Sequence, residues 1–311
     1  GKYILIVNSK EQDCEWAQTH AQAEMPIFMQ PWWLDAVCAG KEWEEILPCM
    51  PCLVRKKWWM RWITMPQQTQ IGGMWVDVNT CTIEQVREKA QQIDAKLREM
   101  KLDYYYQQYP VGSPLPAELK QLGYKVKERV TYQLQDLSDL DKVIDGFSRN
   151  KKRQLQKALS LHADRDLNAE DFYRFHTECL MQQHKTISYS REFFLVLDRK
   201  AQREQKAQIM AIRNADNQLL AAGYVVWDEK AMHYLIAAQN AEFKDSGAMS
   251  LLVLECIKLA REKGVVFDFE GSMIENVETS FRRFGAVPTE YYQIFKSRKF
   301  FSVINNFHKL F

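Results

Sequence analysis

One sequence pattern occurs at the end of the first half of the chain and again at the end of the second half. This recurrence limits the possible folds more than any other feature. Each copy runs from a helix ending in Arg-Glu through an aromatic strand, a short helix and a glycine to a further strand. The first copy spans 98–132 with its glycine at Gly123, and the second spans 261–292 with its glycine at Gly285. The spacing from the Arg to the Gly is almost equal in the two copies. This recurrence predicts an internal duplication and two similar domains, which we assign to residues 1–136 and 137–311.

Hydrophobic periodicity and turn residues predict the elements of both halves. In the first half we expect helices at 32–39 and 82–100 and a short one ending at 122, with strands at 46–57, 58–65, 103–108 and 124–135. In the second half we expect helices at 139–161, 168–184, 190–204, 246–263 and 276–284, with strands at 206–213, 218–227, 231–239, 265–270 and 287–296. Strands joined by turns as short as those between 206 and 239 must be antiparallel. The predicted fold class is therefore α/β, with a mixed, mostly antiparallel sheet flanked by helices in each domain.

Composition places the chain among soluble globular proteins. Of its 311 residues, 46% are hydrophobic and 26% are charged, and 42 basic against 40 acidic side chains leave a formal charge of +2. This balance argues against DNA as a partner, although a local basic patch can hold phosphates. No apolar run reaches the roughly 18 residues of a membrane helix, and no export signal is recognisable. We expect a cytoplasmic protein with at most peripheral membrane contact.

The seven cysteines are odd in number and have no disulfide framework spacing, which is typical of free thiols. Cys49 and Cys52 form a lone CxxC motif. It interrupts strand-like sequence and has no second CxxC or His pair, so we interpret both as buried structural cysteines. We predict no metal site.

The order of elements over 168–296 resembles that of a GNAT acyltransferase domain, and three blocks of sequence resemble the FemAB-like branch of that superfamily. The blocks are Phe28-Met-Gln30-Pro-Trp32-Trp33-Leu-Asp35, Arg149-Asn-Lys-Lys152-Arg153-Gln-Leu-Gln-Lys157-Ala158, and Phe267-Asp268-Phe-Glu270-Gly-Ser272 followed by Phe281-Arg-Arg-Phe284-Gly285-Ala286. The resemblance implies two GNAT domains and transfer of an acyl or aminoacyl group to an amine. Enzymes of this branch add amino acids to peptidoglycan precursors from aminoacyl-tRNA, and related proteins are CoA-dependent.

The resemblance also implies a phosphate-binding turn before the helix at 246–263. Its residues here would be Lys244, Ser246, Gly247 and Ala248, whose N–H groups would hold the donor's phosphates. Met249 fills a position that is small in the GNAT pattern, which departs from an acetyl-CoA site. A glycine that merely eases the start of a helix explains the turn equally well.

A stripe of basic residues lies on the helix that opens the second half. Arg149, Arg153 and Lys157 recur every four residues, with Lys152 beside them. Such a run is ordinarily a solvated helix face. The resemblance favours instead a site for the phosphates of tRNA or of a nucleotide-linked precursor, for which Arg and Lys are well suited.

Acid–base candidates follow from the strand at 265–270. Alternation puts Phe267 and Phe269 on one face and Asp268 and Glu270 on the other. Aminolysis of an ester or thioester needs a carboxylate to orient the amine or accept its proton, so Glu270 is the first choice and Asp268 the second. An ion pair with Arg282 or Arg283 is the structural alternative.

The loop after the helix at 168–184 offers His184 and Tyr189 as further acid–base candidates, although a lone loop His is more often simply solvated. Trp33 and Ser272 are assigned to substrate contact. Eight of the nine tryptophans precede residue 76, and the stretch 56–62 alternates basic and aromatic groups. Most of these rings are expected in a core, while some could stack on sugars or bases or touch a membrane surface.

The sequence thus predicts an acyltransferase with no tightly bound cofactor, using acyl-CoA or aminoacyl-tRNA as donor and a small-molecule or cell-wall precursor as acceptor. Two alternatives stay open. One is a CoA-dependent N-acyltransferase acting on a small amine or sugar, and the other is a catalytically inactive tandem-GNAT binding protein.

Overall fold

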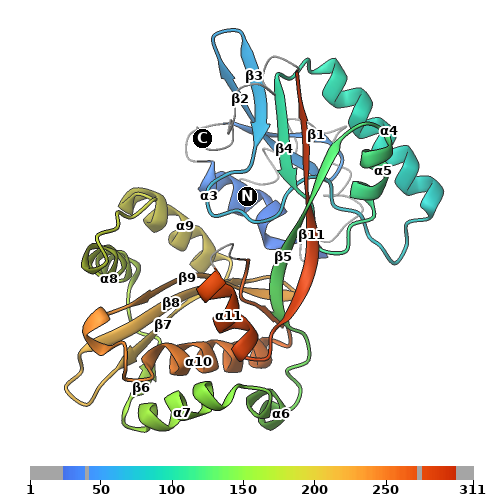
Figure 1. Cartoon of the computed structure of the whole chain (residues 1–311). Helices are drawn as coiled ribbons and strands as arrows, with labels where there is room; N and C mark the ends of the chain where they lie inside the picture. Colours follow the sequence, from blue (N-terminus) through green and yellow to red (C-terminus); the bar gives the residue numbers. More distant parts are fainter. Residues whose placement is uncertain (1–23, 39–41, 272–274, 299–311) are drawn as a thin grey trace. The chain divides into compact units, whose positions relative to one another are not determined.

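A computed structural model describes residues 24–38, 42–271 and 275–298, which divide into two compact units (Figure 1). Unit 1 contains the described residues up to Val130 and those from Glu290 onward, and unit 2 is Thr131–Thr289. The division of the chain at residues 136 and 137 stays a prediction.

Unit 1 is a sheet in the order β1-β2-β3-β4-β11 with helices packed on it. The first three strands are antiparallel, β3 and β4 are parallel, and β4 and β11 are antiparallel. The strands are β1 Trp43–Leu47, β2 Met50–Lys57, β3 Met60–Thr64, β4 Tyr104–Gln108 and the end of β11 Val287–Ser297, and the helices are η2 Ile27–Met29, α3 Pro31–Val37, α4 Ile83–Glu99 and α5 Leu115–Gln121.

The helix α4 forms where the sequence predicts it. Thr82 and Gln85 make a capping box, which satisfies two N–H groups at the start of the helix. Val86, Ala90, Ile93 and Leu97 then bury one apolar face. The strand predicted over 46–57 is wrong in one respect, because Cys49, with a φ of 62°, turns the chain between β1 and β2.

Unit 2 is a sheet in the order β5-β10-β9-β8-β7-β6. The strands β7, β8 and β9 form the predicted antiparallel hairpins, β9 and β10 are parallel, and β10 and β5 are antiparallel. Its strands are the end of β5 Lys125–Leu134, β6 His162–Asp164, β7 Ala207–Arg213, β8 Leu219–Trp227, β9 Ala231–Gln239 and β10 Val266–Asp268, and its helices are α6 Leu140–Asp145, α7 Arg149–Lys157, η3 Ala158–Ser160, α8 Ala169–Gln182, α9 Arg191–Arg203, η4 Ala241–Phe243, α10 Ala248–Lys263 and α11 Glu275–Arg283.

Helices cover both faces of the unit 2 sheet (Figure 1). Tyr224 of β8 packs against Phe172 of α8 and Phe194 of α9. Its neighbour Gly223 faces Leu252 of α10 on the opposite side. The mixed sheet flanked by helices confirms the predicted fold class.

Two expectations for unit 2 are wrong in detail. The helix predicted over 139–161 is broken into α6 and α7, because the Ser148 side chain caps a new helix at the Lys151 N–H. The strand predicted over 265–270 ends at Asp268.

The last strand of each half belongs partly to the other unit. β5 follows α5 in unit 1, yet its residues Gln133 and Leu134 pair with β10 in unit 2. β11 follows α11 in unit 2, yet its residues 293–297 pair with β4 in unit 1. The final strand of each predicted half therefore pairs in part within the other unit.

Candidate functional site

The unit 2 sheet is irregular at one place along β9. Parallel pairing with β10 stops at His233 and Asp268, although β9 continues to Gln239. On its other edge, Leu235 is an extra residue between two pairs with β8, which is a β-bulge. Bulges and strand ends commonly aim groups into functional sites, so this stretch of β9 and the end of β10 form the candidate site.

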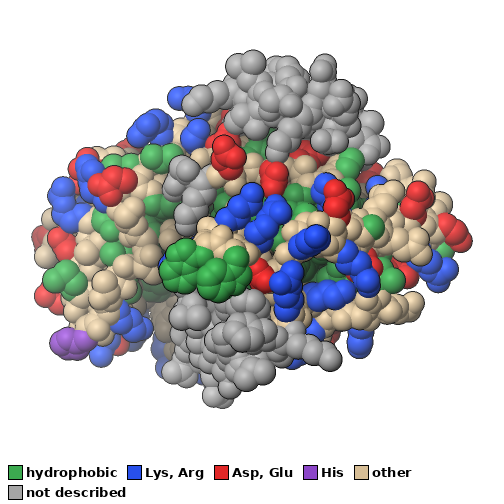
Figure 2. Space-filling model, turned by 90° about the horizontal axis from the view of Figure 1, so that it is seen from above, with side chains coloured by type: hydrophobic (Ala, Val, Ile, Leu, Met, Phe, Trp, Pro, Cys, Tyr) green, Lys and Arg blue, Asp and Glu red, His purple; other side chains and the backbone are tan. Residues whose placement is uncertain are grey.

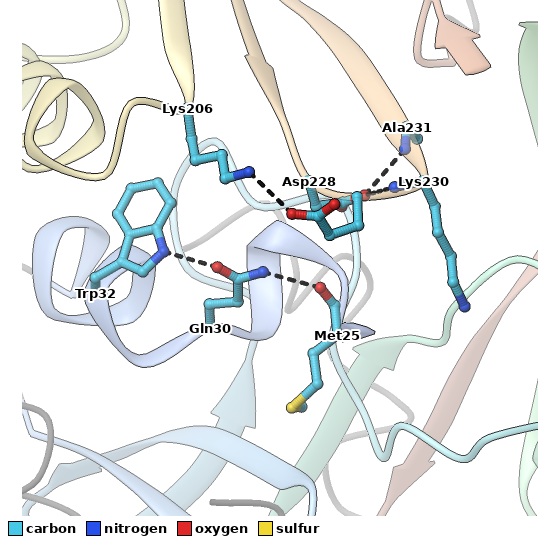
Figure 3. A network of polar contacts seen from close by, with 8 residues as sticks. Met25, Gln30, Trp32, Lys206, Asp228, Lys230 and Ala231 are labelled. Atoms are coloured by element: carbon cyan, nitrogen blue, oxygen red, sulfur yellow. Dashed lines mark hydrogen bonds and ion pairs between the residues drawn. The ribbon is translucent and has the colours of Figure 1, made fainter. Parts of the chain in front are cut away.

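The start of β9 is fixed by a tight turn. Asp228 accepts hydrogen bonds at Oδ1 from the N–H groups of Lys230 and Ala231, at 2.8 and 2.9 Å. Lys206 contributes an ion pair to Glu229 at 3.3 Å, and Figure 3 draws this turn from close by. The turn sets the register in which His233 comes to lie beside Asp268.

Asp268 is held by three hydrogen bonds and is almost fully buried. Its Oδ1 accepts from the hydroxyl of Thr131 and from the N–H of Glu270, each at 2.6 Å, and its Oδ2 accepts from the amide of Gln133 at 2.8 Å. A carboxylate with both oxygens occupied in this way is suited to holding its neighbours in place.

Glu270 follows Asp268 with a left-handed backbone, at a φ of 63°. Its Oε1 lies 3.6 Å from Nδ1 of His233, and the two side chains are 21% and 5% exposed. Burial, and then the nearby charge of Asp268, raise the pKa of the Glu270 carboxyl well above its ordinary value. A carboxylate with a raised pKa is a stronger base than an ordinary glutamate, which suits acceptance of a proton from an amine.

Among the described residues, Arg282 pairs with neither Asp268 nor Glu270. Arg282 donates to Glu278 at 3.1 Å and to the hydroxyl of Tyr132 at 3.3 Å. The faces of the strand agree with the expected alternation, because Phe267 and Phe269 both contact Tyr234 on the side away from Asp268.

The predicted phosphate turn is packed against α7. Gly247 has a φ of 83° and lies so close to this helix that a Cβ would stand 2.1 Å from the carbonyl oxygen of Gln154. The Ser250 hydroxyl is hydrogen-bonded to the side chain of the same Gln154. Ser246 closes the turn by donating to the carbonyl of Phe243 and accepting from the N–H of Ala248. The first turn of α10 is thus covered by protein, while Lys244 is exposed.

The predicted basic stripe lies on the outer face of α7. Its four side chains are exposed, and within the described part of the chain no ion pair holds them: Arg149, Lys152, Arg153 and Lys157. The inner face of α7 carries Lys151, whose Nζ donates to Ser280 at 3.0 Å and lies 4.6 Å from the centre of the Phe284 ring. Burial, followed by the charge of Arg283, lowers the pKa of Lys151.

His184 and Tyr189 lie in the same loop, but only Tyr189 is buried. His184 is exposed and lies two residues after the end of α8, with a φ of 58°. Tyr189 is buried, and its hydroxyl lies 2.6 Å from Nδ1 of His176. Burial raises the pKa of Tyr189 and lowers that of His176, so this pair stays neutral near pH 7.

Trp33 is fully buried and donates to the hydroxyl of Thr69 at 3.0 Å. Its neighbour Trp32 donates to Gln30 at 2.7 Å, and Gln30 donates to the carbonyl of Met25 at 2.9 Å (Figure 3). The Trp-Trp block therefore forms part of the unit 1 core, and Trp33 offers no surface to a substrate. Ser272 lies outside the described residues.

Periodicity did not single out His233, Thr131, Gln133 or Gln154. Thr131 and Gln133 do alternate within the strand predicted over 124–135. Only the pairing of that strand with β10 places them on Asp268, and the sequence carries no signal for this pairing.

Cys49 and Cys52 are buried free thiols, as predicted, and burial raises the pKa of Cys52. Within the described ranges, no three His, Cys, Asp or Glu side chains are gathered so that they could bind a metal ion. None of the helices described is both long and apolar enough to span a membrane.

One known protein family matches part of the chain. Residues 136–275 match the family model described as an acetyltransferase (GNAT) domain. No curated protein matches the chain.

Many solved structures are similar to the chain, among them the following three. The crystal structure of FemX has a TM-score of 0.70 at 14% identity and covers 87% of this chain and 93% of its own. The structure of L-PGS from Bacillus licheniformis has a TM-score of 0.52 at 13% identity, with 89% and 95% covered. The C-terminal domain of a putative lysylphosphatidylglycerol synthetase from Agrobacterium fabrum has a TM-score of 0.52 at 12% identity, with 82% and 83% covered. At these identities the likeness establishes the fold alone.

Proposed function

We propose, from the premise that residues 136–275 carry a GNAT domain, that this protein transfers an acyl or aminoacyl group to an amine. The observation that carries the proposal is Glu270, a carboxyl with a raised pKa at the point where β9 and β10 part. Asp268 holds the backbone of Glu270 in place, and His233 lies beside its carboxyl.

The proposed reaction is an aminolysis. The acceptor amine attacks the carbonyl carbon of the donor, and a C–N bond forms as the C–O or C–S bond to the donor breaks. Glu270 accepts the proton that the amine loses, and the donor leaves as an alcohol or thiol after taking up a proton. No covalent bond to the protein is needed.

The donor is proposed to be aminoacyl-tRNA rather than acyl-CoA, which GNAT enzymes commonly use as co-substrate. The carbonyl of Gln154 approaches Gly247 where a CoA pyrophosphate would need free N–H groups, and its partial negative charge would repel a phosphate. Four exposed cations on the outer face of α7 offer a surface for RNA phosphates instead. The acceptor is proposed to be an amine of a cell-wall precursor, in line with the FemAB-like sequence blocks.

The first experiment is calorimetric titration of the whole chain with acetyl-CoA, a longer acyl-CoA, and a tRNA acceptor-stem analogue carrying an amide-linked amino acid. The variants are Arg153→Ala and, as a matched control, Lys120→Ala on the exposed face of α5. We expect the RNA analogue to bind, with affinity about tenfold lower in Arg153→Ala and unchanged in the control, since removing one charge-assisted hydrogen bond costs roughly 1.4 kcal/mol.

Each other outcome selects an alternative. Binding of either CoA ester would overturn the tRNA donor and favour a CoA-dependent N-acyltransferase on a small amine or sugar. Binding of none of the three probes would favour a catalytically inactive binding protein.

A further inference from the structure

The hairpin of β2 and β3 ends in two exposed tryptophans. The side chains of Trp58 and Trp59 are 78% and 81% exposed, and their rings stack with centroids 5.9 Å apart. At the other end of the hairpin, Trp62 and Ile63 are buried. The strands are thus anchored in the unit 1 core, and the indoles at the tip contribute little to it.

The turn between these strands is an unfavourable place for tryptophan. Lys57 pairs with Met60, so the connection has two residues, and Trp58 has a φ of 55°. A two-residue turn with a positive φ at its first position favours Gly there, and a bulky side chain in the left-handed region is disfavoured. The sequence therefore keeps two large apolar rings in water at a conformational cost, which points to a use outside the fold.

The tip is also strongly basic. Between residues 55 and 61 there are four cations and no acid: Arg55, Lys56, Lys57 and Arg61. The Lys57 Nζ lies 5.2 Å from the centre of the Trp58 ring. Figure 2, a view from above Figure 1, shows hydrophobic side chains next to Lys and Arg side chains.

We propose that this hairpin tip docks on the surface of an anionic lipid bilayer, with the indoles of Trp58 and Trp59 in the headgroup layer and Lys56 and Lys57 at the lipid phosphates. Tryptophan is favoured at membrane interfaces because its ring is apolar and its N–H is polar. Each Lys near an anionic surface adds to the attraction. The contact is peripheral and does not rest on the proposed transfer reaction.

The ring geometry favours a lipid surface over a nucleic-acid base or a sugar. Base or sugar recognition uses an open aromatic face. Here the centroids of the two indoles are only 5.9 Å apart, which leaves no gap for a base between them, and the Lys57 ammonium lies over Trp58. Both rings are otherwise largely exposed, which suits insertion among lipid headgroups.

The test is sedimentation of the full chain with vesicles of phosphatidylcholine containing about one third phosphatidylglycerol, compared with phosphatidylcholine alone. Trp58→Gly combined with Trp59→Asn removes both rings and places Gly at the residue with the positive φ, so the hairpin is retained. Lys56→Gln combined with Lys57→Gln removes charge alone. Leu159→Ser combined with Met181→Ser is the matched control, because these side chains of unit 2 are 77% and 66% exposed.

We expect the chain to bind the anionic vesicles, with a blue shift of tryptophan fluorescence. Both tip variants should lower the affinity at least about tenfold, since each removes roughly 1.4 kcal/mol or more of attraction, and the control should leave it unchanged. Equal binding by the Trp variant, equal loss in the control, or equal binding to neutral vesicles would each overturn the proposal. Binding of an oligouridine probe that the Trp variant loses, without vesicle binding, would assign the tip to base stacking.

Discussion

Glu270 differs from every other described glutamate in combining a left-handed backbone with a buried carboxyl beside a second acid. If it accepts the amine proton, Glu270→Gln should lower the turnover rate by about 10²- to 10⁴-fold with little change in donor binding. The acidic limb of the wild-type pH–rate profile should lie above the ordinary range of glutamate and vanish in the variant. Steady-state kinetics checks both, with the exposed Glu88→Gln of α4 as control. An unchanged acidic limb in Glu270→Gln would remove its role as base.

The same carboxyl should make stability depend on pH. Its pKa is raised in the folded chain, so between the ordinary glutamate value and the raised value the unfolded chain binds fewer protons than the folded one. The free energy of unfolding therefore falls with rising pH across this window, and the contribution is intact only below it. Glu270→Gln should show a smaller fall, measured by urea unfolding at a series of pH values. Parallel curves for the two proteins would contradict the raised pKa.

At the scale of single residues, strand alternation predicts which side chains share a face, and side-chain chemistry predicts which of them could act as a base. The opposite faces of Phe267 and Asp268 follow from the strand period. His233 and Thr131 were not predicted, because they reach Asp268 from strands that are close in space and distant in sequence. Glu270 is predictable as the base because aminolysis needs a carboxylate. Its left-handed backbone is not predictable, because it depends on the hydrogen bond from its own N–H to Asp268.

Among the elements, α10 has a left-handed glycine at each end, and the two should respond differently to alanine. Gly264→Ala adds a Cβ in open space, so only the backbone conformation should cost stability, by about 1–2 kcal/mol. Gly247→Ala adds the same cost and also forces its Cβ against the Gln154 carbonyl, which should destabilise the chain by about 1–3 kcal/mol more. Urea unfolding of the two variants measures the difference. Equal effects of the two substitutions would show that α7 does not pack on this turn.

The outer face of α7 should contribute to RNA binding through charge alone. Replacing Arg149, Arg153 and Lys157 by Gln should weaken binding of the acceptor-stem analogue and flatten its dependence on salt. The slope of log K against log salt should fall by about 0.9 for each RNA phosphate that the variant no longer neutralises. Fluorescence anisotropy over a salt series checks this, with Lys120→Gln as control. An unchanged slope would show that the basic stripe is an ordinary solvated helix face that does not bind RNA.

Most elements could be predicted because periodicity and capping act locally. The helix α4 lies within one residue of its predicted bounds, since Thr82 caps it and its apolar face is regular. The break between α6 and α7 was missed, because amphipathic periodicity continues across Gly146 while the Ser148 cap starts a new helix. The strand β6 has three residues, which is too short for a period to be recognised.

For the molecule as a whole, the exchange of final strands means that a cut between the two halves separates strands that pair with each other. A fragment of residues 137–311 lacks Thr131 and Gln133, and one of residues 1–136 lacks the β11 residues that pair with β4. Neither fragment alone should unfold cooperatively, and co-expression should restore a complex with the thermal midpoint of the intact chain. Calorimetry and size-exclusion chromatography check this. A fragment 137–311 that melts as sharply as the whole chain would show that β5 is dispensable.

The duplication stays a prediction at this scale, and it rests on the two series ending at Gly123 and Gly285, which repeat in order and spacing. The exchange was not predictable. β5 and β11 could each pair within their own half or with the other half. The sequence pattern is the same in either case, although the structure pairs β5 with β10 and β11 with β4.

The exchange of final strands also determines when the strands of unit 1 can pair during synthesis on the ribosome. Although unit 1 begins near the amino terminus, the edge of β4 has to wait for residues 293–297, which are made long after Gln108. During that delay β4 offers a bare strand edge to other nascent chains. Synthesis rate and chaperone supply should therefore decide the yield of this protein more than the stability of its finished form.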